Sequence, residues 1–150
     1  MGSDVRLSGT AFDPAAELAA FTAAHPQAGG VVSFLGQVRL EAGEVEALEL
    51  RHFEPLTLPG MAELADEAQR RWALDGLLLL HRHGTMRPGE PIVLVAAAAR
   101  HRRDAFAAAD FCMDHLKSRA WFWKREKTAA GWRWIEPRED DHADLARWAK

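Results

Sequence analysis

Residues 77–98 read LLLLHRHGTMRPGEPIVLVAAA, and this stretch decides the fold. Its two apolar runs, residues 77–83 and 92–98, are dense enough in leucine, valine and alanine to form central strands covered on both faces. Between them, Arg87-Pro88-Gly89-Glu90 has the composition of a turn. The stretch therefore predicts two central strands joined through that turn.

The chain before this stretch predicts one helix and two further strands. Asp13-Pro14 has the pattern of an N-cap followed by proline at the first helical position, and the helix is expected to run to about His25. Gly29-Gly30 breaks the chain, and residues 31–35 have strand composition. Apolar and charged residues alternate over residues 48–51, which is typical of a half-buried strand.

Apolar residues at helical spacing predict two longer helices, the first of them after a loop around Pro55 and Pro59. The apolar stripe of the first consists of Met61, Leu64, Ala65, Ala68 and Trp72. The stripe of the second, expected to be buried, consists of Phe106, Ala109, Met113 and Leu116.

The C-terminal part predicts an aromatic hairpin. Residues 121–123 (WFW) and 132–134 (WRW) flank Ala130-Gly131, and a short helix is expected over residues 139–150. Strands and helices are mixed without strict alternation, which favours an α+β fold over a doubly wound sheet. Because no repeat or linker divides the chain, we expect a single domain over residues 1–150.

Composition limits the class of protein. No apolar run is long enough to span a membrane, and the N-terminus has neither the basic start nor the apolar stretch of a signal peptide. One cysteine, Cys112, excludes an intrachain disulfide and suits a reducing compartment, so we expect a cytoplasmic protein. The net charge is −3, yet residues 100–127 hold eight Lys/Arg and four Asp/Glu. This pattern favours a localised anion site over a surface for nucleic acid.

Two lysines in the basic segment are candidates for chemistry. If the second long helix ends near Arg119, Lys117 lies in its last turn and Lys124 on the following strand. Both ammonium groups could then reach one pocket, next to the aromatic residues between them. The alternative is that these cations only complement the helix C-terminus, which is common.

Other cations could bind an anion. His101-Arg102-Arg103 is expected between a strand and a helix, where free backbone N–H groups, an arginine and an imidazole would suit a phosphate. Taken alone, a solvated loop with a helix cap explains this motif better. Arg39 follows a strand in which Gly36 could permit close backbone approach, and Arg138 follows Pro137 after the hairpin.

Metal and thiol chemistry are disfavoured. The pairs His81/His83 and Cys112/His115 do not match a zinc signature, and a thiol on a core helix is usually inert. The sequence also contains no P-loop and no dinucleotide-binding glycine pattern.

Taken together and in order, several motifs resemble the large subunit of the molybdopterin synthase family. The series runs from about Gly29 to Trp148, and although no single match is specific, the ordered set is. Trp121 stands where that family usually has proline, and residues 51–59 depart from its usual pattern. The matching stretches are FLGQVR (34–39), HRHG (81–84), PGE (88–90), HRRDAF (101–106), MDHLKSR (113–119), FWKRE (122–126) and WIEPR (134–138).

The resemblance implies an α/β-hammerhead-type fold with an added antiparallel aromatic hairpin. It also implies a homodimer of large subunits within a heterotetramer, with a small ubiquitin-like sulfur-carrier subunit bound to each. The carrier's C-terminal Gly-Gly thiocarboxylate would convert cyclic pyranopterin monophosphate into the molybdopterin dithiolene. No metal or other cofactor, nucleic acid or membrane is implied.

The resemblance also implies roles for individual residues. Lys117 and Lys124 match the active-site lysines, with Lys117 nearest the carrier terminus. The remaining matches are Arg39, His101 and Arg102 for the substrate phosphate, Arg138 supplied across the dimer interface, and Phe34, Met113 and Trp123 lining the pocket.

Two alternatives remain at this stage. The basic segment, residues 100–127, could bind a nucleotide or RNA through aromatic stacking and phosphate contacts in a non-catalytic protein. A paralogue could also keep the fold as a scaffold without turnover. The acidic chain as a whole argues against the first, and the presence of both lysines and Arg39, Arg102 and Arg138 argues against the second.

Overall fold

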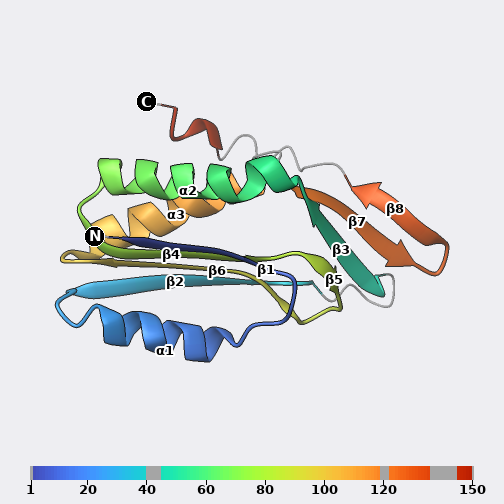
Figure 1. Cartoon of the computed structure of the whole chain (residues 1–150), viewed down its shortest axis with the longest axis horizontal. Helices are drawn as coiled ribbons and strands as arrows, with labels where there is room; N and C mark the ends of the chain where they lie inside the picture. The colour runs from blue at the N-terminus through green and yellow to red at the C-terminus, as the bar shows by residue number, and fades with distance from the viewer. Residues whose placement is uncertain (1, 40–44, 119–121, 136–144, 150) are drawn as a thin grey trace.

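The computed structural model describes residues 2–39, 45–118, 122–135 and 145–149. Within these ranges, three helices and two four-stranded sheets confirm the expected α+β class (Figure 1). The elements are β1 (Ser3–Ser8), α1 (Pro14–Ala24), β2 (Gly30–Gln37), β3 (Ala47–His52), α2 (Glu54–Arg71), β4 (Leu74–Arg82), β5 (Gly84–Met86), β6 (Pro91–Ala99), α3 (Arg102–Ser118), β7 (Phe122–Thr128) and β8 (Gly131–Ile135).

The first sheet has the strand order β1-β4-β6-β2, and the two apolar runs form its central strands β4 and β6, as expected. These two strands pair antiparallel, and the predicted turn is present, with a hydrogen bond from the Glu90 amide to the Arg87 carbonyl. Leu77 and Leu79 belong to the larger core cluster and Leu78 and Leu80 to the smaller one. Because side chains of a strand alternate between faces, the unbroken leucine run has both faces buried.

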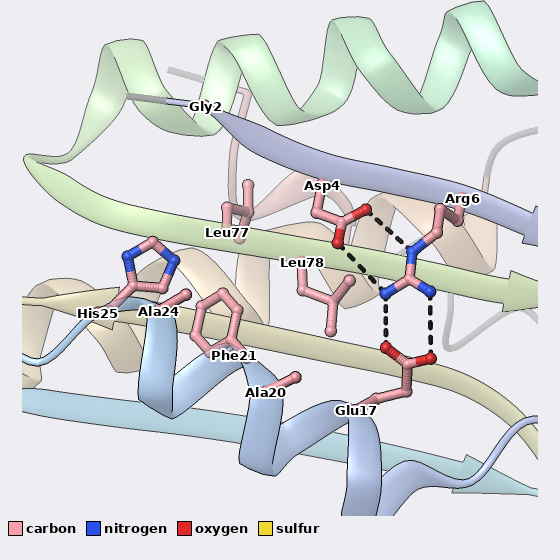
Figure 2. Close-up of a pocket in the computed structure, with 10 residues that line it drawn as sticks. All are labelled: Gly2, Asp4, Arg6, Glu17, Ala20, Phe21, Ala24, His25, Leu77 and Leu78. Carbon is pink, nitrogen blue, oxygen red and sulfur yellow. Dashed lines mark hydrogen bonds and ion pairs between the residues drawn. The ribbon is translucent and has the colours of Figure 1, made fainter.

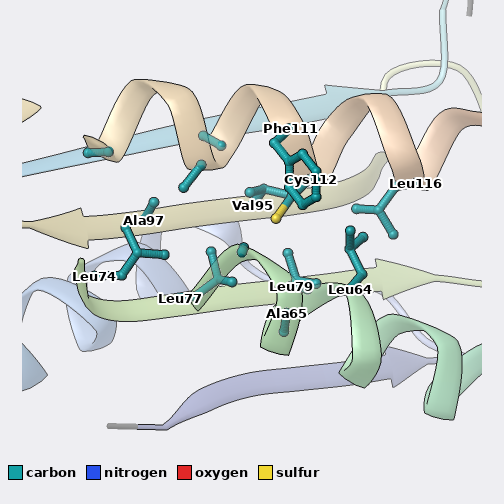
Figure 3. Packing of buried hydrophobic residues seen from close by; sticks show 14 of the residues in the cluster. Leu64, Ala65, Leu74, Leu77, Leu79, Val95, Ala97, Phe111, Cys112 and Leu116 are labelled. Atoms are coloured by element: carbon teal, nitrogen blue, oxygen red, sulfur yellow. The ribbon is translucent and has the colours of Figure 1, made fainter. Parts of the chain in front are cut away.

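Helices cover both faces of this sheet (Figure 1). The larger cluster lies between the sheet and the helices α2 and α3, where the ring of Phe111 and the thiol of Cys112 pack over Val95 and Leu79 (Figure 3). On the other face lies α1, which begins as expected at Asp13, whose carboxylate accepts hydrogen bonds from the amides of Ala15 and Ala16. The position of α3 therefore follows from its buried small residues, which pack on β6.

The second sheet, with the order β5-β3-β7-β8, extends from one end of the first (Figure 1). The expected aromatic hairpin is β7-β8, and Gly131 has a φ of +112° at its turn, a conformation that favours glycine. One face of this sheet joins a third cluster made of Val38, Leu48, Leu50 and Met86, with Phe122 packed against it. The other face carries exposed tryptophans.

Several sequence expectations were wrong or incomplete. Pro55 and Pro59 lie within α2 and not in a loop, because Pro55 occupies the first turn, where no backbone donor is needed. Phe106 is 60% exposed, because the buried stripe of α3 is centred one position away, on Ala105, Ala108 and Cys112. The strands β1 and β5 were not predicted. Most of the expected C-terminal helix, residues 139–150, lies outside the described residues.

Across the described ranges, no helix combines the length and the apolar character that a bilayer crossing requires.

Candidate functional site

Lys117 lies where the sequence predicted it, in the last turn of α3, and its side chain is exposed. The charge of Lys117 reaches His81, the next-to-last residue of β4, because it contributes to lowering the pKa of that imidazole. Lys117 therefore stands over the end of a central strand and not on a remote surface.

His81 forms the floor of this region. Its ring is buried, and this burial, together with the charges of His83 and Lys117, lowers the pKa to about 4. Its Nδ1 lies 2.9 Å from the Arg82 carbonyl oxygen, which only accepts, so the neutral ring carries its proton on Nδ1. The ring stacks on Phe122, with centroids 4.0 Å apart and planes 19° apart. The stack joins the end of β4 to the start of β7.

Lys124 lies two residues beyond Phe122 on β7 and so on the same face of that strand. Its neighbours across the sheet are Leu50 on β3 and Ile135 on β8. Two residues along a strand span about 7 Å. Lys124 therefore lies on the strand that contributes Phe122 to the stack, and Lys117 on α3 is near enough for its charge to act on His81, the other ring of the stack.

Arg39 belongs to the same end of the molecule. The residue before it, Val38, is buried in the cluster that contains Leu50 and Phe122. Arg39 follows a residue buried between the two sheets, the charge of Lys117 acts on His81 at the end of β4, and Lys124 follows Phe122 on β7. We call these three residues the seam cations.

His101 and Arg102 lie elsewhere in the same chain. They stand at the N-terminus of α3, which packs closely on the start of β2: a Cβ added to Gly29 would come within 2.0 Å of the Arg100 carbonyl oxygen. Lys117 is at the other end of α3, and fifteen residues of helix span about 22 Å. A single chain does not bring His101 and Arg102 to the seam cations.

The predicted pocket-lining residues lie on three different elements. Phe34 is 45% exposed on β2 and lies on the face that α3 covers, since it pairs with Val95. Met113 is half-buried on α3 against the larger core cluster. Trp123 lies on the face of β7 opposite to Lys124, where its ring contacts Phe53 edge to face. Arg138 lies outside the described residues.

Side chains, and not the backbone that was expected, come close to Gly36. A Cβ at this position would lie 2.8 Å from Val93 Cγ1 and 3.3 Å from the ring of Phe34. The glycine therefore leaves room for the Phe34 ring beside the strand.

The thiol and the histidine pairs do not form a reactive centre in the described part of the chain. No group of three or more His, Cys, Asp or Glu residues suited to a metal ion occurs there. Burial raises the pKa of the Cys112 thiol to about 12, which leaves the thiolate almost absent at neutral pH.

A shallow hollow between β1, α1 and β4 is separate from the seam cations, and none of the predicted site residues lines it (Figure 2). Its one cation, Arg6, is held by Glu17 at 2.6 Å and by Asp4 at 2.9 Å. Because both carboxylates already neutralise the guanidinium, the hollow offers little attraction to an anion.

Sequence reasoning missed two groups at the seam. The sequence suggested His81 only as a metal ligand, and the one sign of its burial was its position within an apolar run. The ion pair between Arg82 and Glu90, 2.6 Å apart, was not predicted, although both residues lie in motifs that carried the family resemblance.

Comparisons with known proteins show the family to which the chain is similar. The family described as "MoaE protein" matches residues 7–119. A molybdopterin synthase catalytic subunit of Mesorhizobium japonicum is 50% identical over 151 residues, covering 96% of this chain and 92% of the relative.

Solved structures give the same result. A molybdopterin biosynthesis MoaE protein from Burkholderia ambifaria superposes with a TM-score of 0.84 at 42% identity, covering 99% of each chain. A protein–protein complex of subunits 1 and 2 of molybdopterin-converting factor from Helicobacter pylori contains a chain of the same fold, with a TM-score of 0.75 at 20% identity, covering 89% of this chain and 91% of that one.

Proposed function

The chain belongs to the MoaE protein family, that of the molybdopterin synthase catalytic subunits, and we propose that its seam cations carry the sulfur transfer of this enzyme. The observation that carries the proposal is the position of both lysines beside the His81–Phe122 stack: the charge of Lys117 acts on His81, and Lys124 lies two residues beyond Phe122 on β7. Family membership also favours an enzyme over the nucleotide-binding and scaffold alternatives.

The proposed reaction uses two anionic partners. The thiocarboxylate sulfur at the end of a small ubiquitin-like carrier subunit attacks an oxygen-bearing side-chain carbon of cyclic pyranopterin monophosphate. A C–S bond forms as the C–O bond at that carbon breaks, and the displaced oxygen stays on the opened phosphate or leaves as water. Water then adds to the carbonyl of the resulting thioester, the acyl C–S bond breaks, and the carrier leaves as a carboxylate while sulfur stays on the pterin. Two such transfers give the dithiolene.

The seam cations suit this chemistry. Both partners are negatively charged, so their approach is opposed by Coulomb repulsion, and fixed cations offset it while holding the reacting atoms. In the proposal, Lys117 orients the thiocarboxylate and stabilises the oxyanion as the thioester forms and breaks. Lys124 transfers protons or binds the pterin, and Arg39 binds the phosphate.

The proposal requires a second copy of the chain. His101 and Arg102 stand about 22 Å along α3 from Lys117, a length that a small pterin does not bridge. In a symmetric dimer, the same residues of the other protomer can complete the pocket, as we also propose for Arg138. We therefore propose a homodimer within a heterotetramer, with one carrier subunit on each copy.

Replacing Lys117 with alanine tests the proposal. The Lys117→Ala variant should form no molybdopterin from a thiocarboxylated carrier, while its affinity for the carrier changes little. The control is Lys127→Ala, which removes an exposed lysine from β7 on the face that does not carry Lys124 and should keep normal turnover. Near-normal turnover of Lys117→Ala would refute the assigned role.

The proposal extends to organisation and location. Residues 1–150 are taken as one catalytic-subunit domain, and the enzyme is placed in the cytoplasm, where a free thiol such as Cys112 stays reduced. It uses no metal or other cofactor and binds neither nucleic acid nor membrane.

A further inference from the structure

The backbone just before Arg39 is hydrogen-bonded to a turn and not to a neighbouring strand of the sheet. Pairing of β2 with β6 becomes irregular at Gly36 and Gln37, the last residues of the strand. Beyond that point the Val38 amide donates to the Glu90 carbonyl at 2.9 Å, and the Gly89 amide donates to the Val38 carbonyl at 2.7 Å. The backbone that enters Arg39 therefore depends on where residues 89 and 90 lie.

Glu90 fixes that turn with its side chain. One carboxylate oxygen accepts from the Arg87 amide at 2.6 Å, which closes the turn, and the other accepts from the Arg82 guanidinium at 2.6 Å. Charge-assisted bonds of this length are about twice as strong as neutral ones. The Arg82 guanidinium keeps the pKa of Glu90 below its ordinary value, so the carboxylate stays ionised at neutral pH.

Arg82 is itself anchored in the core. It is the last residue of the central strand β4, its side chain is buried, and a second guanidinium nitrogen donates to the Thr85 carbonyl at 3.3 Å. A buried cation with an ionised partner is costly to disturb, because removing one charge leaves the other uncompensated. The central strand β4 thus fixes the turn through Arg82, and the turn fixes the backbone of Val38.

We propose that the Arg82–Glu90 ion pair is a positioning device that sets Arg39 in the substrate pocket. The inference rests on the proposed function, in which Arg39 binds the phosphate of the pterin precursor. Neither Arg82 nor Glu90 touches the substrate; both act through the backbone of Val38. Their removal affects binding of the precursor and not of the carrier.

The test compares four proteins in the assembled synthase: wild type, Glu90→Gln, Arg39→Ala and the double variant. Glu90→Gln keeps the side-chain shape but removes its charge, and should raise KM for cyclic pyranopterin monophosphate on the order of tenfold, with a smaller change in kcat. Arg39→Ala should raise KM at least as much. In the Arg39→Ala background, Glu90→Gln should have no further effect on KM, because the guanidinium that Glu90 positions is already absent.

Glu17→Gln is the matched control, since Glu17 pairs with Arg6 at the same 2.6 Å distance in the hollow away from the seam. It should leave KM unchanged. If Glu90→Gln folds poorly, as a lower Tm would show, Arg82→Lys replaces it. That variant keeps the charge but cannot make both hydrogen bonds, and should raise KM in the same non-additive way.

The outcomes distinguish the positioning role of the Arg82–Glu90 pair from the phosphate-binding role of Arg39. Raised KM in Arg39→Ala with unchanged KM in Glu90→Gln and Arg82→Lys overturns the positioning role alone. Equal effects of Glu90→Gln with and without Arg39 overturn it as well, since the pair would then act elsewhere. Unchanged KM in Arg39→Ala refutes the phosphate role of Arg39 in the proposed function.

Discussion

His81 lies flat against Phe122, with ring centroids 4.0 Å apart and an angle of 19° between the planes, and this stack joins the two sheets. The imidazole is neutral and buried, and its proton is used in a bond to the Arg82 carbonyl. Protonation of His81 at acidic pH should therefore destabilise this junction between the two sheets.

The first prediction concerns stability against pH. The pKa of His81 is about 4 in the folded chain against 6.5 ordinarily, so between these values the unfolded chain binds a proton that the folded chain does not. Stability then rises with pH across this window, and His81 accounts for about 3 kcal/mol lost as pH falls from 6.5 to 4. His81→Phe keeps an aromatic ring but cannot titrate. Urea unfolding at several pH values should show a flatter profile for the variant; profiles of equal slope would contradict this.

A second prediction concerns Cys112. Because its thiol is buried and its pKa is raised to about 12, the native protein should resist alkylation at pH 8 and react only when unfolded. Cys112→Ala should keep full turnover and lose about 1 kcal/mol of unfolding free energy. Loss of turnover in a folded Cys112→Ala variant would contradict this prediction and support a nucleophilic role for the thiol.

A third prediction uses neighbouring glycines. Gly29→Ala places a Cβ within 2.0 Å of the Arg100 carbonyl oxygen, so the start of α3, with His101 and Arg102, must move. In Gly30→Ala the new Cβ meets Arg102 at 3.6 Å, an ordinary contact. Gly29→Ala should lower the unfolding free energy by 1–3 kcal/mol, roughly the cost of overpacking, and raise KM for the precursor, whereas Gly30→Ala changes both much less. Similar thermal unfolding of the two variants would show that this contact is not tight.

Much of the fold could be predicted from local patterns. The leucine run at residues 77–80, the Asp13 cap and the Gly131 turn act through backbone chemistry that is readable one element at a time. The strand β1 also carried a signal, since Val5 and Leu7 alternate with polar neighbours. The stripe of α3 was misplaced because alanine has little hydrophobicity of its own: Ala105 and Ala108 are buried for their small size against β6, and Phe106 is displaced outward.

The site was less predictable, because its parts are joined by tertiary contacts. The lysines could be placed on a helix end and a strand from spacing alone. The separation of Arg102 from Lys117 follows from the length of α3, yet the family motifs gave no indication of which copy supplies each residue. The Arg82–Glu90 pair joins the end of β4 to the turn just before β6, and the antiparallel pairing of these strands brings the two residues close.

The most direct test of the central claim, that the seam cations transfer sulfur in a pocket completed by a second copy, is turnover by mixed dimers of Lys117→Ala and Arg102→Ala. Each variant alone should be inactive. In a random mixture about half of the dimers are mixed, and one of the two pockets in each has both residues intact, so about a quarter of wild-type turnover should return. No recovery in dimers shown to be mixed would contradict the claim, because Lys117 and Arg102 would then have to act within one chain or not together.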